Sequence, residues 1–278
     1  MERIPFGIRR LDNTIGGGAP PGSVVMLSGE AGAGGREFMY TCAVMNALAK
    51  SDPELFDLYY GTEDERNVDL PEVHYISFTA EQRQVRREMT LAMDDEIVES
   101  AIPAISFHDL SSAFYRLSPV PREWYETRTT SLPDLGQNSE RSGVAGALGD
   151  RLTSYAPGNV VVIDSLTDLV TAPDDQLEWH NIPVLMKALS RAAYEWGGLI
   201  LIHVNSDALA DTRYGQLVDA ADGTLLFEWE RGGSAISRTM IVSQFRGVLS
   251  RIEDENIVQF ETEIGDAGFD ISDVRKIR

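Results

Sequence analysis

The sequence predicts an α/β fold: a twisted, mostly parallel β-sheet flanked by helices, with antiparallel strands near the C-terminus. Short apolar runs rich in valine and isoleucine alternate with helix-like segments, which is typical of a parallel sheet covered on both faces. Towards the C-terminus, strand-like runs follow one another with turn residues between them, which is typical of hairpins. The 278 residues are 43% hydrophobic, enough for a sizeable core. No internal repeat is visible, and we expect residues 1–278 to form a single domain.

The elements follow from the apolar pattern along the chain. Parallel strands are expected at residues 24–28, 74–78, 105–108, 160–164 and 199–204. Helices are expected at about 37–50, after the second of these strands, and at about 182–196. Antiparallel strands are expected at 224–229, 238–245 and 257–262. Two polar, turn-rich stretches, about 52–70 and 127–149, are expected to be flexible surface excursions from the domain.

The charge of the chain is strongly acidic. It has 44 acidic residues against 24 basic ones, a formal net charge of -20, and almost all of its basic residues are arginines. An acid excess with little lysine favours a halophilic protein, because concentrated salt screens the repulsion between surface carboxylates. The alternative is an ordinary acidic protein. The same balance argues against nucleic acid as a partner, since binding nucleic acid needs a basic surface.

Several other classes of protein are disfavoured. No apolar run approaches the length of a membrane span, and the first residues lack the apolar stretch of a secretory signal. Cys42 is the only cysteine, so an intramolecular disulfide is impossible and a cytoplasmic location is expected. The four histidines show no spacing typical of metal ligands.

A glycine-rich loop stands between the first expected strand and the first long helix, which is where a phosphate-binding loop occurs. Its residues are Gly29, Glu30, Ala31, Gly32, Ala33, Gly34, Gly35 and Arg36. In the working pattern, two glycines separated by four residues precede a lysine and then a serine or threonine. Gly29 and Gly34 keep this spacing. The backbone N–H groups of such a loop, with the positive end of the following helix, can hold phosphate without any side chain.

The side chains of the pattern are missing. Gly35 stands where a lysine should reach the β- and γ-phosphates, and Arg36 stands where a hydroxyl should coordinate magnesium. Losing one unit charge at ~4 Å forfeits very roughly 4 kcal/mol at an effective dielectric near 20. Arg36 could compensate by contacting a phosphate oxygen, since arginine suits bidentate phosphate contacts. The alternative is a tight glycine turn that binds no ligand.

The flanking motifs resemble those of KaiC-like and RadA-like ATPases of the RecA superfamily. They run in order along nearly the whole chain: 3–8, 11–12, 16–23, 163–167, 203–205, 221–223, 246–247 and 268–271. The resemblance implies a RecA-like P-loop NTPase fold and, with the acidic composition, the HTR-like type of halophilic archaea. It also implies ATP and magnesium as ligands, bound weakly if at all because the phosphate loop is degenerate.

The resemblance also assigns roles to individual positions. Asp164 matches the acid that holds magnesium through water, and Ser165 follows it as in the family. The turn that usually carries the catalytic glutamate has Thr79 and Ala80 in its place, so Glu81, one position later, is the remaining candidate. The alternative for Glu81 is a solvated helix cap.

A further position is implied at the boundary between subunits. Family members extend a Lys-x-Arg pair across the interface to a neighbour's nucleotide. Here the first position of the pair is Gln244, so only Arg246 remains as a trans-acting residue. A homo-oligomer, as a dimer or ring, or a related KaiC-like subunit is therefore the expected partner.

Three places that should serve the γ-phosphate have each lost a residue, although phosphoryl transfer depends on positioning and charge neutralisation. The sequence therefore favours a catalytically impaired protein, a pseudo-ATPase that acts as a regulatory or scaffolding subunit. The main alternative is an active ATPase that uses Arg36 and Glu81 for the missing lysine and glutamate. A third, a RadA-like recombination mediator acting on DNA, is disfavoured by the acidic balance.

Overall fold

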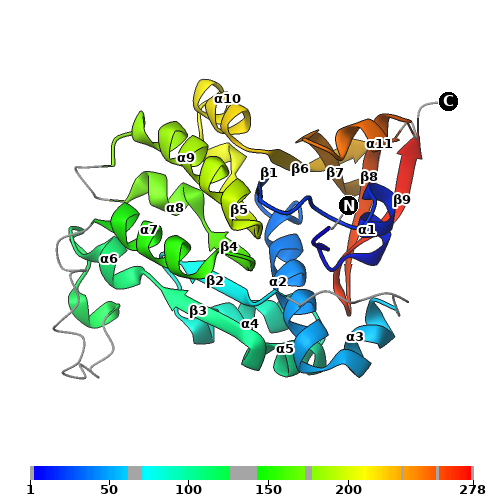
Figure 1. The fold of residues 1–278 in the computed structure, drawn as a ribbon, viewed down its shortest axis with the longest axis horizontal. Helices are drawn as coiled ribbons and strands as arrows, with labels where there is room; N and C mark the ends of the chain where they lie inside the picture. Colours follow the sequence, from blue (N-terminus) through cyan, green and yellow to red (C-terminus); the bar gives the residue numbers. More distant parts are fainter. Residues whose placement is uncertain are drawn as a thin grey trace.

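The computed structural model describes residues 3–61, 71–125, 143–172, 177–232, 235–254 and 257–276. These residues form one nine-stranded sheet in the order β3-β2-β4-β5-β1-β6-β7-β8-β9 (Figure 1). The strands are β1 (Ser23–Gly29), β2 (Val73–Ser77), β3 (Ile105–Asp109), β4 (Val160–Asp164), β5 (Leu199–Asn205), β6 (Gly223–Gly232), β7 (Ala235–Phe245), β8 (Ile257–Gly265) and β9 (Gly268–Lys276). Pairing is parallel from β3 to β6 and antiparallel from β6 to β9.

Helices cover both faces of the parallel part. The helices are α1 (Arg9–Ile15), α2 (Gly35–Ser51), α3 (Pro53–Tyr59), α4 (Gln82–Ala92), α5 (Asp95–Ala101), α6 (Ser111–Tyr115), α7 (Val144–Tyr155), α8 (Leu166–Thr171), α9 (Asn181–Trp196), α10 (Asp211–Ala220) and α11 (Leu249–Asp254), with short 3-10 turns η1 (Ile102–Ala104), η2 (Arg122–Trp124) and η5 (Ser206–Ala208). Of these, α1 and α11 contact the antiparallel strands instead. The α/β class with C-terminal antiparallel strands is thus confirmed. No helix among the described residues is long and apolar enough to cross a membrane.

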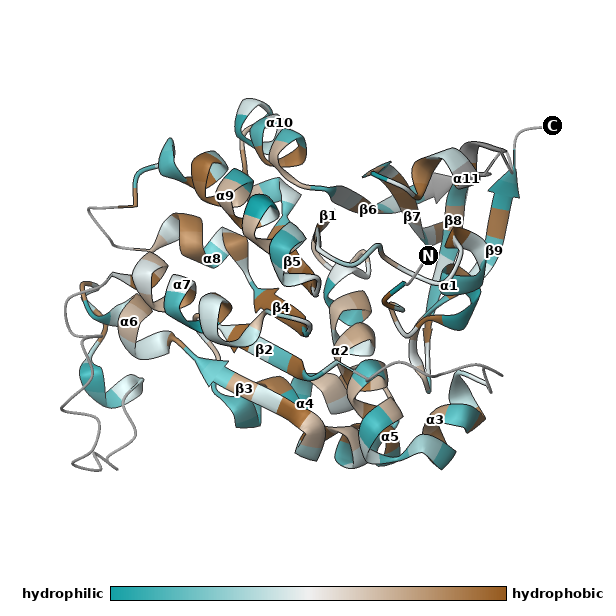
Figure 2. Ribbon diagram, in the orientation of Figure 1, coloured by the Kyte–Doolittle hydropathy of each residue, from teal (hydrophilic) through white to brown (hydrophobic). Residues whose placement is uncertain are grey.

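The central strands are apolar on both sides because they separate two cores. Val160 and Val162 of β4 pack with α2 and its neighbours, whereas Val161 and Ile163 pack with the layer of α7, α8 and α9. Alternate residues of a strand point to opposite faces, so a strand buried on both faces needs a continuous apolar run. Figure 2 shows β4 coloured as hydrophobic along most of its length. This is why the apolar runs located the parallel strands so closely.

Both predicted surface excursions are partly wrong. Residues 53–59 form α3, whose N-cap is Asp52: its carboxylate accepts a hydrogen bond from the N–H of Leu55 at 3.1 Å, and a proline follows it. Residues 144–155 form α7, because Val144, Leu148 and Leu152 make an apolar stripe that packs on the second core. Residues 62–70 and 126–142 lie outside the described part of the chain.

A buried carboxylate fixes the segment that leads into β1. Asp12, in α1, accepts hydrogen bonds from the N–H groups of Phe6, Gly7 and Ile8 at 2.8, 3.0 and 3.2 Å, and from the Tyr60 hydroxyl at 3.0 Å. Burial raises the pKa of Asp12 from 3.8 to about 7 and outweighs the hydrogen bonds, which lower it. The folded protein therefore binds a proton at Asp12 more tightly than the unfolded chain does.

We expect this group to make stability depend on pH. Because the folded pKa of Asp12 is raised, its contribution to the unfolding free energy is fully present below about pH 3.8 and is lost as pH rises through about 7. At about 1.4 kcal/mol for each pKa unit, a rise from 3.8 to about 7 contributes about 4 kcal/mol to the free energy of unfolding at low pH. In urea denaturation, the unfolding free energy of the wild type relative to that of Asp12→Asn should increase as pH falls from 7 to 5. Parallel pH profiles of the two proteins would contradict it.

Candidate functional site

The glycine-rich loop joins β1 to α2 at the carboxyl ends of the parallel strands, where ligands of open α/β sheets usually bind. A cavity of about 340 Å³ lies there, between the loop and the ends of β4 and β5. Its lining residues are Gly29, Glu30, Ala31, Gly32, Gly35, Arg36, Glu37, Ser165, Thr167, Asp168, His203 and Asn205. Of the predicted loop residues, Ala33 and Gly34 do not line it. Asp164 lies beside it, beneath Arg36.

The loop has the backbone shape that an anion site requires. Gly32 and Gly34 have φ values of 75° and 113°, in the left-handed region that glycine tolerates. Within the described part of the chain, no acceptor pairs with the N–H groups of Ala31, Gly32 and Gly34. The N–H groups of the first turn of α2 have no intrahelical acceptor either. The loop and the helix therefore present a set of unpaired backbone donors.

Two side chains of the β6–β7 hairpin hold the loop from outside. The Trp229 indole donates a hydrogen bond to the carbonyl oxygen of Ala31 at 3.1 Å, and the Arg238 Nε donates to that of Gly32 at 3.0 Å. The Arg238 guanidinium also lies 4.6 Å above the Trp229 ring, at cation–π distance. With these two carbonyls engaged on one side, the loop is held in its nest shape without a ligand.

Aromatic packing under the loop gives Gly35 a structural role. A Cβ atom added at Gly35 would meet the ring of Phe227 at 3.2 Å, and one added at Gly34 would meet the ring of Phe269 at 3.0 Å. Phe227 and Phe269 are fully buried and form an edge-to-face pair at 5.7 Å. Because position 35 has no side chain, the start of α2 packs closely against the core where the expected lysine would stand.

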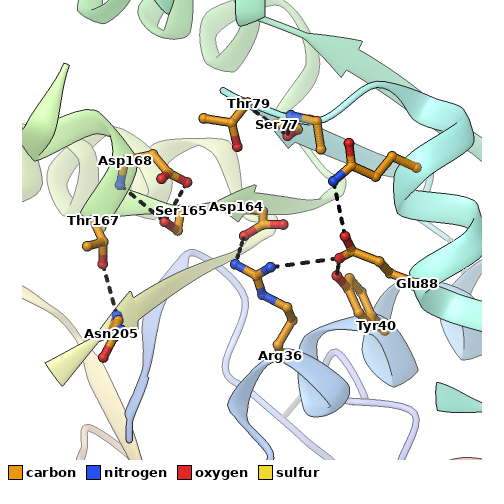
Figure 3. Close-up of polar contacts among 12 residues, drawn as sticks. Arg36, Tyr40, Ser77, Thr79, Glu88, Asp164, Ser165, Thr167, Asp168 and Asn205 are labelled. Atoms are coloured by element: carbon orange, nitrogen blue, oxygen red, sulfur yellow. Dashed lines mark hydrogen bonds and ion pairs between the residues drawn. The ribbon is translucent and has the colours of Figure 1, made fainter. Parts of the chain in front are cut away.

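Arg36 points from α2 to the end of β4, where its Nη2 donates a hydrogen bond to Oδ1 of Asp164 at 3.1 Å (Figure 3). Its Nη1 also lies 3.7 Å from a carboxylate oxygen of Glu88, in α4. The Asp164 side chain is 7% exposed, whereas that of Arg36 is 44% exposed. A partly exposed guanidinium is therefore the counter-ion of a buried carboxylate.

Two tyrosines complete this cluster. The Tyr75 hydroxyl donates to the second carboxylate oxygen of Asp164 at 2.7 Å, and the Tyr40 hydroxyl donates to Glu88 at 2.5 Å. Burial, followed by the charge of Asp164, raises the pKa of both tyrosines, so both hydroxyls keep their protons. Arg36, Asp164, Glu88 and the two tyrosines form one network that links α2, α4 and the sheet.

The same network sets the charges of the ion pair. Burial raises the pKa of Asp164, and the Arg36 charge opposes this by favouring the carboxylate. For Arg36, burial lowers the pKa, but Asp164 and the other acidic groups around it raise it well beyond the ordinary value. Arg36 therefore keeps its charge and favours the carboxylate form of Asp164 against the effect of burial, so each member of the pair depends on the other.

These residues do not fit a magnesium ion. Magnesium prefers six oxygen ligands in octahedral geometry, and here Asp164, the acid that would hold it, is paired with a guanidinium instead. Both carboxylate oxygens of Asp164 already accept hydrogen bonds. The Ser165 hydroxyl donates to Asp168 at 2.8 Å, and no hydroxyl stands at position 36. Arg36 therefore supplies the positive charge next to Asp164 that a metal ion would otherwise supply.

The far wall of the cavity is polar. The Thr167 hydroxyl accepts a hydrogen bond from the N–H of Asn205 at 2.9 Å, which joins the start of α8 to the end of β5. His203, in β5, lines the cavity and is mostly buried, and its Nδ1 has no partner among the described residues. Burial and then the Arg36 charge lower the pKa of His203 to about 4, so the ring is neutral near pH 7.

The predicted candidates outside the loop lie elsewhere. Thr79 and Ala80 form the turn after β2, with the Ala80 N–H donating to Ser77 at 3.0 Å. Glu81 is the N-cap position of α4 and lines two other hollows, of about 990 and 580 Å³, but not the loop cavity. Arg246 is exposed and pairs with Asp222 at 3.2 Å, apart from the cavity of its own chain.

Sequence reasoning missed the residues that hold the site together. Glu88 and Tyr40 belong to no motif, and Trp229 and Arg238 lie on the hairpin, 198 and 206 positions after the loop residues they contact. The one available signal for Trp229 and Arg238 was their place at the facing ends of two strands expected to form a hairpin, and the structure pairs them in register.

No family model matches the chain, and neither does any curated protein. Among solved structures, the chain is similar to a KaiC-like protein from the hyperthermophilic archaeon Pyrococcus horikoshii. The TM-score is 0.60 and the identity 19%, and the match covers 98% of this chain and 99% of the other. Together with the strand order, this similarity shows that the chain has a KaiC-like, RecA-like fold, as the motifs implied.

We expect Arg36→Ala to destabilise the protein by about 1–3 kcal/mol, between the cost for an exposed pair and that for a buried one. The variant leaves Asp164 buried with one donor, so protonation of Asp164 should relieve part of the loss and narrow the deficit as pH falls from 7 towards 5. Urea denaturation at fixed salt measures it. Lys187→Ala, which breaks an exposed pair with Asp219, is the control and should cost under about 1 kcal/mol. An equal, pH-independent loss in both variants would count against the pairing.

Proposed function

We propose that this protein is a catalytically impaired member of the RecA-like fold that acts as a regulatory or scaffolding subunit. The ion pair between Arg36 and Asp164 is the observation that supports this most directly. It puts a fixed side-chain cation against the acid that a working site uses for its magnesium ion. We treat residues 1–278 as one domain in this role.

The remaining geometry is in line with the proposal. Phosphoryl transfer needs a metal, a positioned water and charge around the transferred group. At the candidate cavity, position 35 has no side chain, and the turn after β2 carries Thr79 and Ala80 in place of carboxylates. Glu81 does not line the cavity, which weakens the alternative of an active ATPase that uses Arg36 and Glu81.

The loop and the cavity beside it also fit a regulatory role. The loop, its contacts with Trp229 and Arg238, and the cavity are all present, so the site keeps the elements with which a regulatory subunit would bind a ligand. We propose a second copy of this chain, or a related KaiC-like subunit, as the partner. Arg246, whose side chain is 73% exposed, is the candidate residue for contact with this partner.

Steady-state ATP hydrolysis with magnesium, measured in molar potassium chloride, tests the proposal. We expect no turnover above the rate without protein, and no change with Asp164→Asn, because Asp164 serves Arg36 and not a metal ion. Asp219→Asn, an exposed acid on α10, is the matched control. A rate that Asp164→Asn abolishes and Asp219→Asn leaves intact would refute the proposed loss of catalysis.

A further inference from the structure

The loop cavity has its own permanent cation. Of the five N–H donors on the Arg36 guanidinium, one makes a hydrogen bond within the described residues, that to Asp164. Its Nη1 also lies 3.7 Å from a carboxylate oxygen of Glu88, an ion pair beyond hydrogen-bond distance. The side chain lines the cavity and is 44% exposed. Arginine suits phosphate oxygens because its donors form a planar fork. The guanidinium can therefore keep Asp164 and meet a phosphate group at the same time.

The backbone supplies a second set of phosphate donors. The N–H groups of Ala31, Gly32 and Gly34 have no acceptor among the described residues, and those of the first turn of α2 have no intrahelical one. A glycine-rich loop followed by a helix N-terminus is the arrangement in which such groups form a nest that binds an anion. The outer clamp by Trp229 and Arg238 keeps this nest in shape, so no ordering is needed when an anion enters.

His203 is an independent indication of a polar ligand. It lines the cavity from the opposite wall, and its buried Nδ1 has no partner among the described residues. A buried polar atom without a partner is costly unless a ligand or water serves it. As a neutral ring, His203 can donate one hydrogen bond without adding charge.

The acidic rim limits how much negative charge the cavity can accept. Glu30, Glu37 and Asp168 line it, and the Arg36 charge is already balanced by Asp164. Each additional phosphate group brings more negative charge towards these carboxylates, and position 35 supplies no lysine to offset it. A long phosphate chain is therefore disfavoured relative to a short one.

We propose that the loop cavity binds one or two phosphate groups of a nucleotide without a divalent cation, with Arg36 as the cation of the site. This inference rests on the proposed function, since it takes the loop as a nucleotide site that has lost hydrolysis. It goes further by naming the ligand class, a nucleoside monophosphate or diphosphate, and by excluding magnesium from the bound state.

Isothermal titration of ADP and of ATP, each with excess magnesium chloride and with excess EDTA, tests the inference on the wild-type chain. We expect the Kd of ADP to be the same with and without magnesium within about threefold, and ATP to bind no more tightly than ADP. Magnesium-dependent binding, tighter binding of ATP, or no binding under either condition would each overturn the inference. ATP turnover in the same samples would instead refute the proposed function.

Variants test the role of Arg36. Arg36→Gln should weaken ADP binding by at least about tenfold in EDTA, whereas Lys187→Gln, which removes one exposed charge on α9, should leave it unchanged. The double change Gly35→Lys with Arg36→Thr restores the working loop pattern and should make nucleotide binding depend on magnesium. Circular dichroism melts confirm that each variant is folded before titration. A double variant that stays indifferent to magnesium would contradict the role of Arg36.

Discussion

The buried carboxylate of Asp164, at the end of the central strand β4, is the constraint around which this site is arranged. A carboxylate that is 7% exposed needs a counter-charge, because leaving a charge buried and unpaired costs several kcal/mol. Arg36 meets that need, and the remaining contacts follow from it. Glu88 balances the guanidinium from α4, Tyr40 holds Glu88, and Tyr75 takes the oxygen of Asp164 that the arginine leaves. The helix that begins at the loop is thereby tied to the sheet by charge as well as by apolar packing.

The loop shows how a site can keep its backbone geometry while its side-chain chemistry changes. The nest of N–H groups depends on left-handed glycines and on the two carbonyls held by Trp229 and Arg238. None of these contacts involves the positions that a catalytic loop would use for phosphate and metal. The loop shape therefore does not depend on a lysine at position 35 or a hydroxyl at position 36, and a cavity of about 340 Å³ lies beside it.

The sequence predicted the parallel sheet well and the helices less well, for a physical reason. Strands buried on both faces need unbroken apolar runs, which are easy to recognise; α3 and α7 are short helices in polar surroundings, and only an Asp52–Pro53 cap or a three-residue apolar stripe marks them. Within the site, the motif positions could be located, but their contacts could not. Arg36 and Asp164 are 128 positions apart, and nothing in a linear pattern says that one neutralises the other. The sequence shows only that position 36 lacks the expected hydroxyl, whereas the structure shows that Arg36 pairs with Asp164.

The close packing at Gly35 limits which substitutions the loop tolerates. A lysine at position 35 would press against Phe227 and place a second cation beside Arg36, while a threonine at position 36 would leave the Asp164 carboxylate without its counter-ion. Each of these single substitutions is unfavourable in the present core. Positions 35 and 36 are therefore epistatically coupled, since the effect of a substitution at one depends on the residue at the other and on the packing beneath both.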